Sequence, residues 1–289
     1  MPYELRCSAG VSPPLFGRIL KEAIPIHLLF WRPQTRKEEL MPILRIITAA
    51  LTLAFLSAAF LMPSLQAQQQ ISKKSDKIPQ GRTVYMGREI AQTMHYTGAP
   101  WLIRENRENE ERCSLMLANL KIKTGMTICD MGCGNGFYSL QLAKMVGPAG
   151  EILAVDVQPQ MLYLLRTRME AEAIENVTPI LGSFHNPHLP KNRVDYILMV
   201  DVYHELSHPK VMLKYMRDSL KEDGQIVLLE YREEDPKVPI KPLHKMSKKQ
   251  ILKEYAANGF KLTGEFDKLP WQHMMFFGKD PEWNEKDSQ

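Results

Sequence analysis

The sequence has 289 residues, of which 44% are hydrophobic, and a formal net charge of +4. This length allows one sizeable globular domain plus accessory segments, because a domain usually takes about 100–200 residues. The lysines and arginines are spread along the chain without an arginine-rich block, which argues against nucleic acid as a partner. Four irregularly spaced cysteines do not make a disulfide framework. We expect Cys129 and Cys133 to be buried thiols and not zinc ligands.

An uncharged apolar segment of 17 residues, from Ile46 to Met62, precedes the expected domain. Its length lies between a signal-peptide core of about 7–15 residues and a spanning helix of about 20. We interpret 41–67 as a signal peptide or a membrane anchor, 1–40 as an extension without regular structure and 68–80 as a disordered linker. Either interpretation predicts an exported domain in preference to a cytoplasmic one. A cleaved signal peptide would leave the domain periplasmic or secreted, and an anchor would hold it outside on the membrane through 46–62.

Beyond the linker, short apolar runs alternate with amphipathic segments, the pattern of a parallel sheet covered by helices on both faces. In chain order we expect a helix at 104–120, a strand at Thr127–Asp130, a helix at Gly136–Val146, strands and helices alternating at Glu151–Val155, Pro159–Ala173 and Val177–Leu181, a strand at Val194–Val200, a helix at Pro209–Leu220, a strand at Gln225–Glu230 and a helix at Ser247–Asn258. The runs KLTGEF and HMMFFG then predict an antiparallel hairpin. The expected fold is α/β, a Rossmann-like, doubly wound, seven-stranded sheet that is mostly parallel, within residues 81–280 and before a solvated tail at 281–289.

The sequence TICDMGCGNGFYSL, which begins at Thr127, is a strand that enters a glycine-rich turn and then a helix. Glycines let the backbone turn sharply and approach a ligand, and the helix N-terminus offers unpaired N–H groups. Asp156 ends the next strand, some twenty residues after the last glycine, where a carboxylate can bind ribose hydroxyls. The pattern predicts a site for an adenosyl ligand, although a glycine turn alone can also be purely structural.

At this motif, which has GxGxG after Asp130, the sequence resembles the class I S-adenosylmethionine-dependent methyltransferase family over about residues 110–277. The resemblance implies S-adenosyl-L-methionine as the cofactor. It implies that Gly132, Cys133, Gly134 and Gly136 line the methionine half, Asp130 stabilises the turn and the amino group, Asp156 holds the ribose, Val157 and Met161 flank the adenine, Ser183 and Phe184 meet its edge and face, and Asp201 closes the pocket. Ser183 departs from the acidic residue that many members carry, but a hydroxyl can still bond the adenine amino group.

The segment DVYHELSHP follows the strand at 194–200 and carries the candidates for acceptor chemistry. We expect Tyr203, His204 and Glu205 to face the substrate, and imidazole has the ordinary pKa best suited to accepting a proton; loop residues that merely pack there are the alternative. The segment also matches HExxH of zinc proteases, but Pro209 disfavours helical geometry at His208. We assign no metal, although the four histidines His185, His188, His204 and His208 could converge at the sheet edge and hold one.

Four residues before the first strand, Tyr96, Trp101, Arg104 and Arg107, occupy the position of an element that covers the cofactor in similar methyltransferases; ordinary packing would explain them equally well. The regions 82–104 and 231–246 show no pattern, and we interpret the second as a connection over the sheet. We therefore predict methyl transfer to an unidentified small-molecule acceptor. A non-catalytic adenosyl-ligand binding protein and an NAD-type oxidoreductase are the alternatives, and the sequence does not indicate an oligomeric state.

Overall fold

The structure is a computed structural model that describes residues 80–284. The chain divides into the units Met1–Ser75 and Asp76–Gln289, and the described residues belong to the second. The predicted extension at 1–40, the signal or anchor segment at 41–67 and nearly all of the linker lie outside them. Between residues 80 and 284, no helix has the length and apolar character needed to cross a bilayer. Export and membrane association therefore stay predictions.

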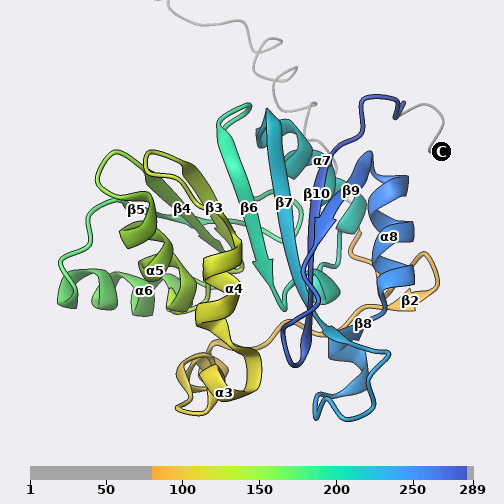
Figure 1. Ribbon diagram of the computed structural model, residues 1–289, viewed down its shortest axis with the longest axis horizontal. Coiled ribbons are helices and arrows are strands. Elements are labelled where there is room, and N and C mark those ends of the chain that lie inside the picture. The colour runs from red at the N-terminus through yellow and green to blue at the C-terminus, as the bar shows by residue number, and fades with distance from the viewer. Residues whose placement is uncertain (1–79, 285–289) are drawn as a thin grey trace, which may run out of the picture. The chain divides into compact units, whose positions relative to one another are not determined.

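A single large sheet organises the described residues, with the strand order β5-β4-β3-β6-β7-β10-β9 (Figure 1). Its strands are β3 (Thr127–Met131), β4 (Glu151–Asp156), β5 (Val177–Leu181), β6 (Val194–Val200), β7 (Leu220–Arg232), β9 (Phe260–Glu265) and β10 (Gln272–Lys279). The ladders from β5 to β7 are parallel, and β10 runs antiparallel to both β7 and β9. The predicted fold class is confirmed, with a two-residue strand β8 (Lys245–Met246) added beside β7.

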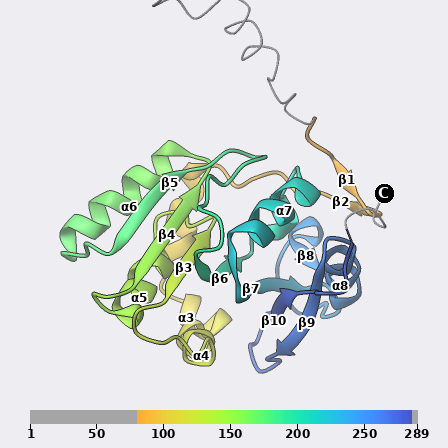
Figure 2. The same ribbon diagram turned by 90° about the horizontal axis from the view of Figure 1, so that it is seen from above.

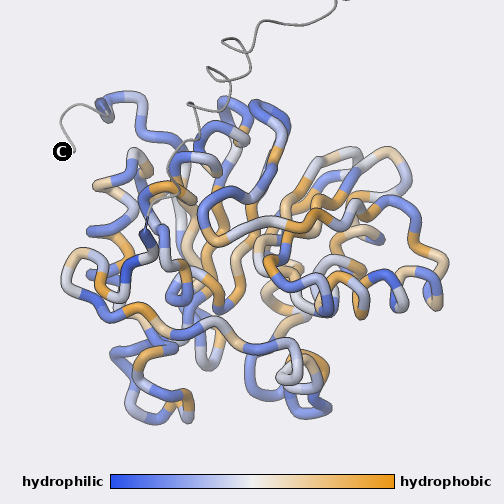
Figure 3. Tube along the Cα trace, turned by 180° about the vertical axis from the view of Figure 1, so that it is seen from behind, coloured by the Kyte–Doolittle hydropathy of each residue, from blue (hydrophilic) through white to orange (hydrophobic). Residues whose placement is uncertain are grey.

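Helices cover both faces of the sheet (Figures 1 and 2). The helices α4 (Cys113–Asn119), α5 (Phe137–Val146) and α6 (Pro159–Ala171) bury one core, and α7 (Pro209–Ser219) and α8 (Lys248–Ala257) bury the other. Strand β6 serves both cores because successive side chains point to opposite faces, Leu198 to the first and Ile197 to the second. Figure 3 shows the hydrophobic residues gathered along these central strands.

Several short elements lie outside the large sheet. They are β1 (Val84–Tyr85), β2 (Arg88–Glu89) and the 3₁₀ turns η1 (Tyr96–Ile103), η2 (Tyr203–Glu205) and η3 (Pro242–His244). The N–H of Arg82 donates to the carbonyl of Ser207 at 2.8 Å, and the N–H of Ala91 donates to the carbonyl of His204 at 3.1 Å. Residues 82–91 therefore form a strap along the loop that follows β6.

Two predicted elements differ from the structure. The single helix expected at 104–120 is two helices, α3 (Arg107–Glu111) and α4, because Arg112 between them adopts a left-handed conformation with φ of 54°. The helix expected to end at Leu220 ends at Ser219. Strand β7 begins at Leu220 and extends past Gly224. A Cβ on Gly224 would lie 2.8 Å from the carbonyl oxygen of Val194, so glycine permits this close approach of β7 to β6.

Candidate active site

A cavity of about 540 Å³ opens at the carboxyl ends of β3, β4 and β6. Ligands bind at this edge in open α/β sheets. We divide the residues that line this cavity into two groups. The cofactor side consists of Gly132, Gly134, Asp156, Val157, Met161, Ser183 and Phe184, and the acceptor side consists of His204, Glu205 and His244. Asp201 lines the same cavity, so ten of the fourteen predicted site residues face it: the cofactor side, Asp201, His204 and Glu205.

The glycine turn after β3 depends on backbone conformations that favour glycine. The φ angles of Gly132, Gly134 and Gly136 are 71°, 53° and 81°. A Cβ on Gly134 would meet Leu102 at 2.5 Å, and one on Gly136 would meet Leu165 at 2.3 Å. Gly136 is the N-cap of α5 and is not among the residues that line the cavity, so the predicted contact of Gly136 with the cofactor stays a prediction. Its role is to let α5 start against α6.

Asp156 ends β4 with its carboxylate fixed by the backbone. The N–H of Gly134 donates to Oδ2 at 3.0 Å, and the N–H of Gln158 donates to Oδ1 at 2.8 Å. Burial raises the pKa of this carboxyl, and the backbone donors oppose the rise. Asp156 therefore ties the glycine turn to the start of α6, while its carboxylate still lines the cavity where a pair of hydroxyls can donate to it.

Asp130 is buried beneath the glycine turn and accepts a hydrogen bond from Ser139 Oγ at 2.6 Å. Burial raises its pKa to about 6. Asp130 and Cys133 line a small adjoining cavity together with Arg107, so neither faces the main cavity directly. Cys113, Cys129 and Cys133 are free and buried, as expected for the last two.

The loop after β5 carries the two residues expected at the adenine. Ser183 donates its N–H to the carbonyl of Asn186 at 2.8 Å, and its hydroxyl accepts the N–H of Asn186 at 3.1 Å. This tight turn presents the ring of Phe184, which is 49% exposed. An exposed aromatic ring on the wall of a cavity offers an apolar surface on which a planar ring can stack.

The segment 96–107, which lies between β2 and β3, covers part of the cavity. Trp101 and Arg107 line it, and the N–H of Tyr96 donates to Gln158 Oε1 at 2.8 Å. Arg107 pairs with the buried Glu111 at 2.9 Å. Arg104 does not line the cavity: its guanidinium lies 3.7 Å from the ring centroid of Trp101. Of these four residues, Trp101 and Arg107 are therefore placed to touch a ligand.

Asp201 follows β6 in a left-handed conformation with φ of 55°. Its Oδ2 accepts a hydrogen bond from Gln272 Nε2 at 2.8 Å, whereas its buried Oδ1 has no hydrogen-bond partner in the structure of residues 80–284. Burial, together with the Glu111 and Glu230 carboxylates, raises the pKa of Asp201 well above its ordinary value. A buried polar atom without a partner beside a cavity is a place for a hydrogen bond from a ligand.

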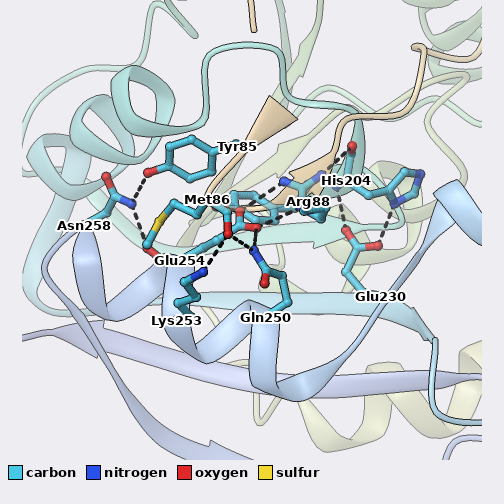
Figure 4. Close-up of polar contacts among 10 residues, drawn as sticks. Tyr85, Met86, Arg88, His204, Glu230, Gln250, Lys253, Glu254 and Asn258 are labelled. Carbon is cyan, nitrogen blue, oxygen red and sulfur yellow. Dashed lines mark hydrogen bonds and ion pairs between the residues drawn. The ribbon is translucent and has the colours of Figure 1, made fainter. Parts of the chain in front are cut away.

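His204 is 2% exposed and is held on three sides. Its Nδ1 lies 2.6 Å from Glu230 Oε2, and its backbone N–H donates to Glu230 Oε1 at 3.2 Å. Arg88 donates to its carbonyl at 3.0 Å. Figure 4 shows Arg88 between Glu254 and the His204 backbone, with Glu230 against the His204 ring. Burial alone would lower the pKa of His204, but the carboxylates of Glu230 and Glu205 outweigh burial and raise it.

His204 faces two further polar side chains across the cavity wall. Its Nε2 lies 3.0 Å from His244 Nδ1 and 3.9 Å from Glu205 Oε1. Burial raises the pKa of Glu205 to about 7, and it lowers the pKa of His244 with help from His204. The region 231–246 is therefore more than a connection over the sheet, because it brings His244 into the acceptor side.

Tyr203 does not face the cavity, contrary to the prediction. It is completely buried and donates to Glu254 Oε2 at 2.8 Å. The expectation failed because η2 turns successive side chains in different directions, His204 toward the cavity and Tyr203 into the core.

The four histidines, whose convergence at the sheet edge was an alternative, do not meet at one point. His204 meets His244, while His208 packs against His185 with ring centroids 5.9 Å apart. His188 instead contacts the carbonyl of Leu181 at 3.0 Å. The segment is not the HExxH motif of a zinc protease either. His204 lies in η2 and His208 is the N-cap of α7, so the two histidines do not share a helix.

Three residues of this site were not predicted from the sequence: Arg88, Glu230 and His244. A signal existed for Glu230, because a carboxylate that ends the apolar run QIVLLE is costly to bury without a partner. Arg88 and His244 lie in segments without a recognisable pattern. Only the folded chain brings them to His204.

Comparison with known proteins gives the family. A family model described as a methyltransferase domain matches residues 122–276, more than half of the chain. The chain belongs to this methyltransferase family. The class I fold predicted from the glycine motif is confirmed by a solved S-adenosylmethionine-dependent methyltransferase from Aquifex aeolicus, which has 24% sequence identity and a TM-score of 0.61 over 64% of this chain and 98% of that one.

Curated relatives with low identity carry a more specific name. The demethylmenaquinone methyltransferase of Geobacillus sp. (strain WCH70) is 27% identical over 114 residues, which cover 39% of this chain and 49% of that protein. The demethylmenaquinone methyltransferase of Staphylococcus aureus (strain JH9) is 25% identical over 166 residues, 57% of this chain and 67% of that protein. The chain thus spans about half the length of the first relative and about two thirds of the second.

Proposed function

We propose that this chain binds S-adenosylmethionine on the cofactor side of the cavity and transfers its methyl group to a small-molecule acceptor on the acceptor side. The observation that carries the proposal is the carboxylate of Asp156, anchored by two backbone N–H groups, in one cavity with the glycine turn. Gly132 and Gly134 line the cavity, so a ligand can approach the backbone there, and the absence of their side chains lets Val202 and Leu102 pack against the turn.

The residues present fit the parts of this cofactor. Asp156 can accept from ribose hydroxyls, Phe184 and Met161 offer apolar surfaces to the adenine, and the orphaned Oδ1 of Asp201 can accept a further hydrogen bond. When bound, the cofactor supplies a methyl group on a sulfonium, which is already electrophilic. The protein then chiefly has to hold an acceptor atom in line with that methyl group and exclude water.

The acceptor side suits a molecule with an apolar body and a polar group. Leu206, Met212, Pro239 and Ile240 line the cavity near the polar residues His204 and Glu205. The names of the curated relatives make demethylmenaquinone the first acceptor to test.

The test is calorimetric titration of the full-length chain with S-adenosylmethionine, S-adenosylhomocysteine and NAD. We expect micromolar binding of both adenosyl ligands, weaker by at least about tenfold in Asp156→Ala, equal to about 1.4 kcal/mol. The control is Tyr163→Ala, which removes a 70% exposed ring from α6, outside the cavity, and leaves binding unchanged. Preference for NAD, or adenosyl binding unaffected by Asp156→Ala, would contradict the proposal.

We further propose that the domain is exported, on the strength of the apolar segment from Ile46 to Met62. S-adenosylmethionine is made inside cells, so an exported enzyme would need a supply of cofactor. Fusion of a reporter enzyme that is active only after export to the C-terminus of the full chain tests this proposal. Reporter activity that deletion of residues 46–62 abolishes supports export, and an inactive reporter on a stably expressed fusion contradicts it.

A further inference from the structure

Three donor atoms from two distant segments converge on the wall of the cavity. They are Nε2 of His204, Nδ1 of His244 and Oε1 of Glu205, separated by 3.0, 3.9 and 4.0 Å. Glu205 and His244 are partly exposed, and all three side chains line the cavity. Two imidazoles and one carboxylate are a ligand set that suits divalent first-row transition metals.

The separations fit a shared ion. Metal–nitrogen and metal–oxygen bonds of about 2.0–2.2 Å place neighbouring ligand atoms about 2.9–3.5 Å apart, according to the coordination angle. The two ring nitrogens already have this spacing. Glu205 Oε1 needs to move inward by about half an ångström. His244 lies in η3, and its side chain is 32% exposed, so this side chain can adjust around an ion.

The surroundings prepare His204 as a ligand. Glu230 is completely buried and accepts at His204 Nδ1, which assigns the proton to that nitrogen and directs the lone pair of Nε2 toward His244 and Glu205. A histidine held by a carboxylate on its other nitrogen is the usual arrangement behind a metal ligand. Arg88, itself paired with Glu254 at 2.9 Å, holds the His204 backbone (Figure 4).

The local charge balance also favours a cation. Glu230 is completely buried, Glu205 is mostly buried and Oδ1 of Asp201 is buried nearby, whereas the mostly buried guanidinium of Arg88 is already matched by Glu254. Lys241 lines the same cavity from an exposed position. Two or three acidic groups in a poorly solvated wall are costly to ionise together, and a divalent ion would offset that cost.

We propose that His204, Glu205 and His244 bind one divalent first-row transition metal ion, of which Zn²⁺ is the representative, on the acceptor side of the cavity. Three protein ligands leave coordination positions open toward the cavity, as in catalytic metal sites. An acceptor that carries an oxygen donor can occupy such a position. The competing arrangement is a simple hydrogen bond in which His244 Nδ1–H donates to His204 Nε2, with Glu205 uninvolved.

Cobalt binding tests the site without reference to methyl transfer. The full-length chain, prepared without a histidine tag and stripped with a chelator, is titrated with Co²⁺, whose visible d–d absorption reports the ligand geometry. We expect one Co²⁺ per chain, displaced by Zn²⁺, and a loss of affinity of at least about tenfold in His244→Ala and in Glu205→Gln. The matched control is His188→Ala, which removes an exposed histidine from outside the cluster.

Two outcomes overturn the metal site. One is the absence of Co²⁺ binding in a protein that still binds S-adenosylhomocysteine, and the other is Co²⁺ binding that neither His244→Ala nor Glu205→Gln weakens. Calorimetry with S-adenosylhomocysteine on the same samples separates this proposal from the proposed function. A protein that binds Co²⁺ through the cluster but binds no adenosyl ligand supports the metal site and contradicts the methyltransferase proposal.

Discussion

The cofactor side and the acceptor side of the cavity are built in different ways. The cofactor side comes from consecutive strand–helix units, and backbone groups hold its key carboxylate, Asp156. The acceptor side is assembled from side chains far apart in sequence, with His204 held by Glu230 and by Arg88, whose partner is Glu254. A site held by backbone groups tolerates changes in its neighbours, whereas a site held by buried charges depends on every partner. This contrast orders the expected effects of mutation.

The largest effect is expected from Arg88→Ala. The change leaves Glu254, which is 0% exposed, as a buried carboxylate without its cationic partner. We expect a loss of unfolding free energy of about 3–5 kcal/mol in urea denaturation. The control is Lys144→Ala, which removes an exposed pair with Glu172 and costs no more than about 1 kcal/mol. Equal losses of unfolding free energy in the two variants would contradict the expected difference between a buried ion pair and an exposed one.

Asp130, buried beneath the glycine turn, makes stability depend on pH. Burial raises its folded-state pKa to about 6 from 3.8, so the folded state holds its proton more tightly than the unfolded state. The stability from this group is therefore fully present below about pH 4 and is lost as pH rises through about 6, a loss of about 3 kcal/mol. Unfolding free energies measured from pH 4 to 7 should fall by about 3 kcal/mol less in Asp130→Asn than in the wild type, because Asp156, Asp201 and Glu205, whose pKa values are also raised, lower the stability of both proteins in this range. A fall of the same size in the variant would refute the assignment.

Glu230→Gln tests whether the acceptor side can be damaged alone. The change keeps a hydrogen-bond acceptor at His204 Nδ1 but removes the charge, and we expect Co²⁺ affinity to fall about 10–100-fold. Binding of S-adenosylhomocysteine should stay within about twofold, because Glu230 does not line the cofactor side. Loss of both kinds of binding would show that the two sides are not separable.

The smallest effect is expected from Phe184→Ala on the cofactor side. The ring is 49% exposed, so its removal should barely change stability. Loss of a stacking surface should weaken adenosyl-ligand binding by a few fold, about 1 kcal/mol. Calorimetry checks this prediction beside Tyr163→Ala, which removes an exposed ring away from the cavity. An unchanged affinity would place the adenine elsewhere.

The same contrast explains what the sequence could predict. The glycine turn and Asp156 belong to a strand–turn–helix and strand-end pattern, whose geometry is local, so the sheet and most of the cofactor side could be predicted. The break between α3 and α4 at Arg112 could not be predicted, because no residue type at this position indicates a left-handed backbone conformation. Tyr203 and His204 are neighbours in a short 3₁₀ turn. Which of them faces the cavity depends on their partners, Glu254 for Tyr203 and Glu230 for His204. Those partners are set by tertiary packing.

A crystal structure of the full-length chain with S-adenosylhomocysteine tests the central claim most directly. The account predicts the ribose hydroxyls within hydrogen-bond distance of Asp156, the adenine beside Phe184, and the sulfur directed toward the side of the cavity that carries His204 and Glu205. A ligand whose ribose lies away from Asp156, or whose sulfur points away from His204, would contradict the division of the cavity into a cofactor side and an acceptor side.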